Sequence, residues 1–204
     1  MISPLIAFYI AIRYRKASSK QLKELSAYYN SLPQVGNNKI VFSFLTIWPT
    51  ILGANATIKG IIIFSAEWAA QLILFNNEET SNAFIITLGH ELAHQDGDFP
   101  LSSYNHKEKH FIHWITEVHH DFSAAERMTQ CSRKKLLASI LYKINAKPNN
   151  EDEHTHPSWK TRKEYVLNYN FDIRLINQIA MDTGCTNTIL VEKVCSHYKP
   201  IYLI

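Results

Sequence analysis

Two histidines four residues apart restrict the local fold more than any other feature of this chain. They close the segment Phe84-Ile-Ile-Thr-Leu-Gly-His-Glu-Leu-Ala-His94, in which apolar residues recur with a helical period. Residues four apart lie on one face of an α-helix, so His90 and His94 are expected to project from the same side. A capping-box-like pair, Asn76 and Glu79, predicts the start of this helix, and Gly97 predicts its end.

Two imidazoles on one helical face can bind the same metal ion. Zinc accepts nitrogen ligands, and catalytic zinc sites keep one position for water. Glu91 follows the first histidine directly and can act as the general base, which is the arrangement of the H-E-x-x-H pattern. The sequence therefore predicts Zn²⁺ bound by His90 and His94, with Glu91 as the catalytic residue. The alternative is a core helix that carries two surface histidines.

A third protein ligand must come from another part of the chain. The metzincin pattern is disfavoured, because Pro100 stands where its third histidine would be. Glu117 and Asp121 lie four apart on a second predicted helix, where Glu117 would complete a His₂Glu site and Asp121 could accept the free ring N–H of a ligand histidine. The alternative is an ordinary acidic helix face. Five nearby histidines are rival ligands: His106, His110, His113, His119 and His120.

The composition indicates one globular domain. The 204 residues are 46% hydrophobic and 12% aromatic, enough for one sizeable core, so we expect a single domain over residues 1–204. The net charge of +3 is mild and its basic residues are scattered, so no nucleic-acid partner is expected. Three cysteines without a C-x-x-C pair favour a reducing compartment, and we expect the cytoplasm.

The N-terminal segment, residues 2–12, is almost wholly apolar. It is too short to span a bilayer, which takes about 20 helical residues, and it lacks the flanks of a signal peptide. A packed N-terminal element is the main expectation, and a peripheral membrane contact is the alternative.

The pattern of the whole chain predicts an α+β fold, with a small sheet followed by mostly helices. Residues 39–47 and 59–65 are rich in β-branched and aromatic residues and are expected to be strands. Residues 149–157 are polar and acidic and are expected to be a loop. Helices are expected before Pro33 and over residues 76–94, 107–130, 136–145, 159–181 and 186–197.

Three segments together resemble the gluzincin peptidases of the HtpX and CAAX-prenyl-protease type. They are Leu88-Gly-His-Glu-Leu-Ala-His94, Glu117-x-x-x-Asp121 and Thr155-His-Pro-Ser-x-x-x-Arg162, and Ala54-Asn-Ala before the strand at Ile61 is similar too. The resemblance covers roughly residues 50–165. Members of that family often carry transmembrane helices, whereas this chain has no apolar run long enough for one.

The resemblance implies a zinc endopeptidase with a mostly helical zincin-like domain and a small mixed sheet. An edge strand, expected here at residues 61–64, would pair with an extended peptide or protein substrate. The family's ligand set would be His90, His94 and Glu117, with Asp121 behind them. His156 or Arg162 would stabilise the tetrahedral intermediate by donating to the oxyanion; the alternative is that His156-Pro157 only opens a helix.

Two other functions stay open at this point. The chain could be a catalytically silent zinc-containing binding or regulatory module, or one whose cleft is occupied by its own apolar tail, residues 198–204. That tail could equally dock a partner or pack on the core. A non-peptide hydrolase that uses the same site is the third possibility.

Overall fold

The computed structural model describes residues 20–43, 53–75 and 77–204. It has the predicted α+β fold, which is mostly helical with one small sheet. The chain forms two compact units that meet within one helix, between Ser81 and Asn82. Compact units need not fold independently, so the single domain expected over residues 1–204 stays a prediction.

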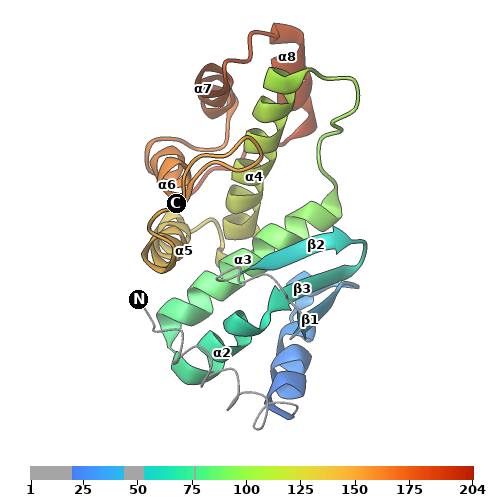
Figure 1. The fold of residues 1–204 in the computed structure, drawn as a ribbon, viewed down its shortest axis with the longest axis vertical. Helices are drawn as coiled ribbons and strands as arrows, with labels where there is room; N and C mark the ends of the chain where they lie inside the picture. The colour runs from blue at the N-terminus through green and yellow to red at the C-terminus, as the bar shows by residue number, and fades with distance from the viewer. Residues whose placement is uncertain (1–19, 44–52, 76) are drawn as a thin grey trace. The chain divides into compact units, whose positions relative to one another are not determined.

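The first unit holds the sheet. Strands β1 (Lys39–Ser43), β2 (Ala54–Ile58) and β3 (Ile61–Ser65) form a three-stranded sheet in the order β1-β3-β2 (Figure 1). β1 is parallel to β3, and β2 is antiparallel to it. Residues 20–30 are helical, as expected before Pro33, and lead through the 3₁₀ turn η1 (Pro33–Val35) to β1. α2 (Ala66–Phe75) follows β3 directly and was not predicted.

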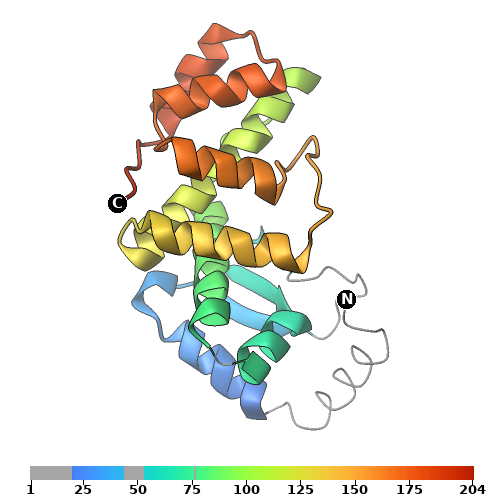
Figure 2. The ribbon, with the colours of Figure 1, turned by 90° about the vertical axis from the view of Figure 1, so that its left-hand side faces the viewer.

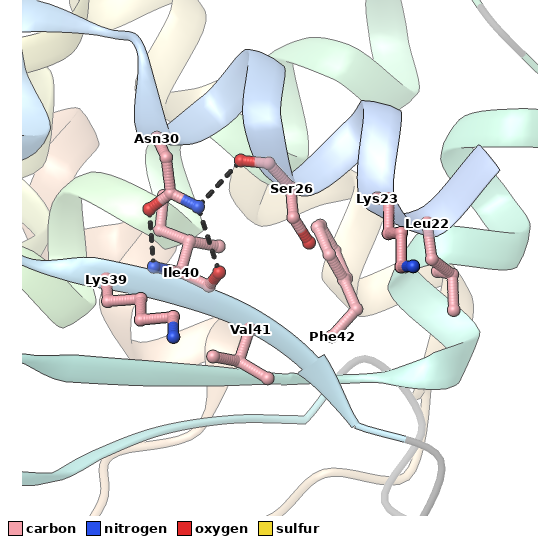
Figure 3. Close-up of a pocket in the computed structure, with 8 residues that line it drawn as sticks. All are labelled: Leu22, Lys23, Ser26, Asn30, Lys39, Ile40, Val41 and Phe42. Carbon is pink, nitrogen blue, oxygen red and sulfur yellow. Dashed lines mark hydrogen bonds between the residues drawn. The ribbon is translucent and has the colours of Figure 1, made fainter. Parts of the chain in front are cut away.

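The groove between helix 20–30 and β1 is drawn in Figure 3. Here the Asn30 side chain pairs with both backbone groups of Ile40, as a neighbouring strand would. Its Oδ1 accepts from the Ile40 N–H at 2.8 Å and its Nδ2 donates to the Ile40 carbonyl at 3.1 Å. Asn30 Nδ2 also donates to the Ser26 carbonyl. One amide side chain therefore ties the helix to the edge of the sheet.

The strand expected at the edge of the sheet is in fact its centre. β3, which contains residues 61–64, pairs with β1 on one side and with β2 on the other, so the edge-strand prediction for this segment is wrong. Gly60, with a φ of 76°, allows the tight turn between β2 and β3, so β2 pairs directly with one edge of β3. The unbroken apolar run of β3 is typical of a central strand.

The second unit is helical and holds every residue of the predicted metal site. Its helices are α3 (Glu78–Asp96), which begins in the first unit, then α4 (His106–Thr129), α5 (Arg133–Ala146), α6 (Trp159–Asn168), α7 (Ile173–Thr183) and α8 (Thr188–His197). Figure 2 shows α5 and α6 side by side across α4, and α7 and α8 beside its N-terminal half.

Local capping explains where these helices begin. Asn105 and Glu108 form a reciprocal capping box at the start of α4, which confirms the helix predicted over residues 107–130. At α3 the cap comes from Asn77, whose Oδ1 accepts from the Thr80 N–H; the predicted cap at position 76 lies outside the described residues. The single helix expected over residues 159–181 is two helices, because Asp172 caps the start of α7.

The C-terminal tail packs on the core of the second unit. Ile201 and Leu203 are buried, and Ile201 exchanges two backbone hydrogen bonds with Phe171. Ile204 is tied at both main-chain groups: its N–H donates to Cys131, and its carbonyl accepts from the Arg133 N–H, both at 2.8 Å. Of the fates expected for this tail, the structure shows packing on the core.

The apolar N-terminal segment, residues 2–12, lies outside the described residues. Within residues 20–43, 53–75 and 77–204, no helix combines the length and apolarity needed to cross a membrane.

Candidate metal centre

α3 presents the two motif histidines side by side, as their spacing predicts. The His90 and His94 ring centroids are 5.2 Å apart, with His90 buried and His94 partly exposed. Gly89 lets α3 approach α4 closely at this point. A Cβ at position 89 would lie 2.6 Å from Met128 Cγ and 2.9 Å from the Ala124 Cα, so no larger side chain fits without moving a helix.

His120 of α4 joins this pair. Ligand nitrogens of His90, His94 and His120 all lie within 4.8 Å of one another, close enough to hold one metal ion. The His120 ring is buried and its centroid is 4.1 Å from that of His94. His120 was one of five rival histidines in the sequence. His120 stands three residues after Glu117 and so shares its helical face, but His113, four residues before Glu117, shares that face too, so spacing alone does not select His120.

The Glu117 carboxylate also lies at this cluster, as predicted. Its Oε2 is 3.3 Å from His90 Nε2, and its Oε1 is 3.6 Å from His94 Nε2. Glu117 is buried on the face of α4 that meets the motif. The potential donor set therefore has four members, three imidazoles and one carboxylate.

Two aspartates orient the histidine rings. Asp121 Oδ1 accepts a hydrogen bond from His90 Nδ1–H at 2.9 Å, which fixes the tautomer and leaves His90 Nε2 to bind a metal, as expected. Asp98 repeats this contact at His94 Nδ1, at 3.2 Å, and also lies 3.4 Å from His120 Nε2. Sequence reasoning missed Asp98, which stands beyond the end of α3.

Arg162 of α6 lies behind the two carboxylates. It is buried, and its Nη2 donates to Glu117 at 2.5 Å, its Nη1 to Asp121 at 3.2 Å and its Nε to the Pro157 carbonyl at 3.2 Å. All three guanidinium nitrogens have acceptors, and these contacts position the two carboxylates. The oxyanion-stabilising role that the family resemblance implied for His156 or Arg162 stays a prediction.

A second buried cation, Lys143 of α5, was also missed by sequence reasoning. Its Nζ lies 4.3 Å from the centre of the Trp159 ring, and the Arg162 guanidinium carbon lies 4.4 Å from the same ring. Burial lowers the pKa of Lys143 to about 8, while Asp121 opposes that shift. Trp159 thus holds two cations near the carboxylates of the site.

The charges of the site favour a cation at the histidine cluster. Burial acts to raise the pKa of Glu117 and of Asp121, but Arg162 together with His90 outweighs it and keeps the pKa of both carboxyls below the ordinary value. Burial likewise opposes charge on His90, yet its hydrogen bonds with Asp121 and Glu117 raise its pKa to about 9. The carboxylates therefore stabilise a positive charge at this position, whether a proton or a metal ion carries it.

His120 differs in charge from its neighbours. Burial, together with the nearby His94 and His90, lowers its pKa strongly, so the ring is neutral and keeps a lone pair for a metal. Its Nδ1 is buried and makes no hydrogen bond to any residue that the structure describes. An unsatisfied buried imidazole nitrogen and a set of nitrogen and carboxylate donors fit a divalent metal ion.

Glu91 and His156 remain available for chemistry. The Glu91 carboxylate is half-buried, burial raises its pKa, and it makes no hydrogen bond or ion pair within the described part of the chain. The His156 side chain is 57% exposed, and its Nε2 lies 3.4 Å from Glu117 Oε1. Of the two predicted oxyanion donors, His156 is therefore the one that faces the cluster and is still reachable by solvent.

Comparison with known proteins adds no relative: no family model, curated protein or solved structure matched this chain.

Proposed function

We propose that this protein is a zinc-dependent metallopeptidase. The observation that carries the proposal is the placement of His90 Nε2 and His94 Nε2 on either side of the Glu117 carboxylate, 3.3 and 3.6 Å from its oxygens, with Asp121 behind His90. Two imidazoles, a carboxylate and an oriented ring N–H are the donors that catalytic zinc sites use.

His90, His94 and Glu117 would hold the zinc. Glu117 is favoured over His120 as the third ligand because its two oxygens face the Nε2 atoms of both motif histidines, and because its negative charge offsets part of the ion's charge. His120 supplies a neutral imidazole to the same cluster and is the alternative third ligand.

The chain's own groups divide the reaction between them. When bound, zinc lowers the pKa of a water molecule and polarises the scissile carbonyl. Glu91 takes the proton of the attacking water and delivers it to the leaving amine; its raised pKa suits both steps. His156 donates from Nε2 to the oxyanion, while Arg162 keeps Glu117 and Asp121 ionised and in place.

The test is cleavage of peptide libraries by the wild-type chain and by Glu91→Gln, with zinc content measured in parallel. Glu91→Gln is isosteric and not a zinc ligand, so it should keep its zinc and lose roughly 10²- to 10⁴-fold in turnover. Glu126→Gln, an exposed glutamate of α4, is the matched control and should cleave at the wild-type rate.

Three outcomes would overturn the proposal. Cleavage by Glu91→Gln at the wild-type rate would show that Glu91 is not the general base. A zinc-loaded wild-type chain that cleaves no peptide would favour the silent binding module, and selective turnover of esters or other amides would favour a non-peptide hydrolase.

A further inference from the structure

A second group of histidines lies outside the metal centre, toward the start of α4. His106, His110 and His113 follow one another at spacings of four and three residues, so they share a face of the helix. His154, from the loop over residues 147–158, lies against them. Its ring centroid is 3.9 Å from that of His106, 4.8 Å from that of His110 and 6.0 Å from that of His113.

The loop that carries His154 is firmly anchored. Trp114 Nε1 donates to the Glu153 carbonyl at 2.8 Å, which ties the loop to α4 directly beside the histidines. Asp152 accepts from the Ser158 N–H at 2.7 Å and from the Thr161 hydroxyl at 2.8 Å, which ties the loop to the start of α6. His154 is therefore held against α4 by the fold and does not meet it by chance.

The rings keep lone pairs that a metal could use. His154 Nε2 donates to the His106 carbonyl at 2.9 Å, so Nδ1 is the nitrogen that carries its lone pair. His110 Nε2 is buried and makes no hydrogen bond within residues 20–43, 53–75 and 77–204. An unpaired buried nitrogen is costly, and coordination to an ion would offset that cost.

The local charges also suit a cation. Burial, and then the neighbouring His154, keep the pKa of His110 and of His113 below the ordinary value, which favours the neutral form of both rings. The loop beside them carries three acidic residues in a row, at positions 151–153, and Asp152 acts electrostatically on His110. Neutral imidazoles beside carboxylates attract a divalent ion without repelling it.

We propose that His106, His110 and His154 form a second site for a divalent cation of borderline softness, of which Zn²⁺ is the representative. His106 and His110 are a chelating pair at the same four-residue spacing as His90 and His94, and His154 Nδ1 supplies a donor from the anchored loop. The rings of His110 and His154 are stacked, so binding one ion requires the rings to rotate about their side-chain bonds until the three nitrogens converge.

Occupancy of this second site acts on the proposed peptidase centre through the loop. His154 and His156 are two residues apart, and His156 Nε2 faces Glu117 while His154 faces His106. A cation on His154 would add a further tie, beside the Trp114 and Asp152 contacts, to the segment that presents His156. This consequence depends on the proposed function, whereas the binding of the ion does not.

The test is the zinc stoichiometry of the full chain after equilibrium dialysis against Zn²⁺. The wild-type chain should bind two zinc ions, and the double variant His106→Gln/His154→Gln should bind one. His197→Gln, an exposed histidine at the end of α8, is the matched control and should keep two. His94→Gln should lose the other ion and keep this one, which separates a failure of this site from a failure of the metal centre.

A second measurement needs no variant of the site. Diethyl pyrocarbonate modifies accessible imidazoles, so peptide mass spectrometry with and without Zn²⁺ reports which histidines the ion covers. Zn²⁺ should protect His106, His110 and His154 and leave His197 equally modified. Unchanged modification of these three at saturating Zn²⁺, or two zinc ions retained by the double variant, would overturn the proposal.

Discussion

Two groups of histidines lie along α4, and they differ in what surrounds their rings. At the metal centre, His90 and His94 each contact an aspartate, and a third carboxylate, Glu117, lies between their Nε2 atoms. At the second group, the rings of His110 and His154 stack on each other at 4.8 Å. The first group is built around negative charge, and the second mainly around other imidazoles.

This difference shifts the pKa of a histidine side chain in opposite directions at the two groups. Hydrogen bonds with carboxylates overcome burial and raise the pKa of His90 to about 9, whereas burial lowers the pKa of His110. A carboxylate behind a ligand histidine also raises its basicity toward a metal. The comparison therefore predicts that the centre on α3 binds zinc more tightly than the second site does.

The largest expected effect comes from removing the cation that balances the carboxylates. In Arg162→Met, Glu117 and Asp121 lose their buried partner, and the free energy of unfolding of the metal-free chain should fall by about 3–5 kcal/mol. Urea denaturation measures this. Arg174→Met is the control: Arg174 is 72% exposed in its pair with Asp172, so its loss should change stability little. Equal losses of stability in the two variants would show that the buried ion pairs of Arg162 matter no more than the exposed pair of Arg174.

The second effect is a pH dependence of stability in the metal-free chain. Because the pKa of His90 rises on folding from 6.5 to about 9, its contribution is complete below pH 6.5 and is lost as the pH rises through about 9. The contribution is roughly 3 kcal/mol at low pH. The difference in unfolding free energy between the wild type and His90→Gln, measured as a function of pH, gives the His90 contribution. It leaves out the contribution of Lys143, whose lowered pKa acts in the opposite direction. A difference independent of pH would show that the carboxylates do not stabilise His90 in this way.

The smallest effect tests the orienting aspartates. Asp121→Asn should weaken zinc binding at the metal centre by about 10- to 100-fold, since the buried carboxylate that orients His90 loses its charge. Asp98→Asn should weaken it less, because the Asp98 side chain is 46% exposed and water can replace it at His94. Competition with a chromophoric chelator measures both affinities, and a larger effect at Asp98 would reverse the proposed order.

The sequence predicts those parts of the fold and site that depend on local spacing. The long helices follow from apolar periodicity, and α4 starts within one residue of its predicted position because its capping box is local. His90, His94, Glu117 and Asp121 were found because each pair is separated by one helical turn, so its shared face does not depend on the rest of the fold.

The remaining features depend on contacts between distant segments. Lys143 and Asp98 join the site only because α5 packs against α6 and because the chain turns after α3, which spacing does not reveal. His120 could not be chosen among the neighbouring histidines without knowing which face of α4 meets α3. The central position of β3 likewise follows from its pairing with β1, a non-local contact.

Zinc-edge anomalous diffraction from crystals of the zinc-loaded chain locates the bound ion directly. We expect an anomalous peak about 2.0–2.1 Å from both His90 Nε2 and His94 Nε2, with a Glu117 oxygen completing the protein ligands. A zinc-loaded chain whose anomalous density lies out of reach of either motif histidine would contradict it.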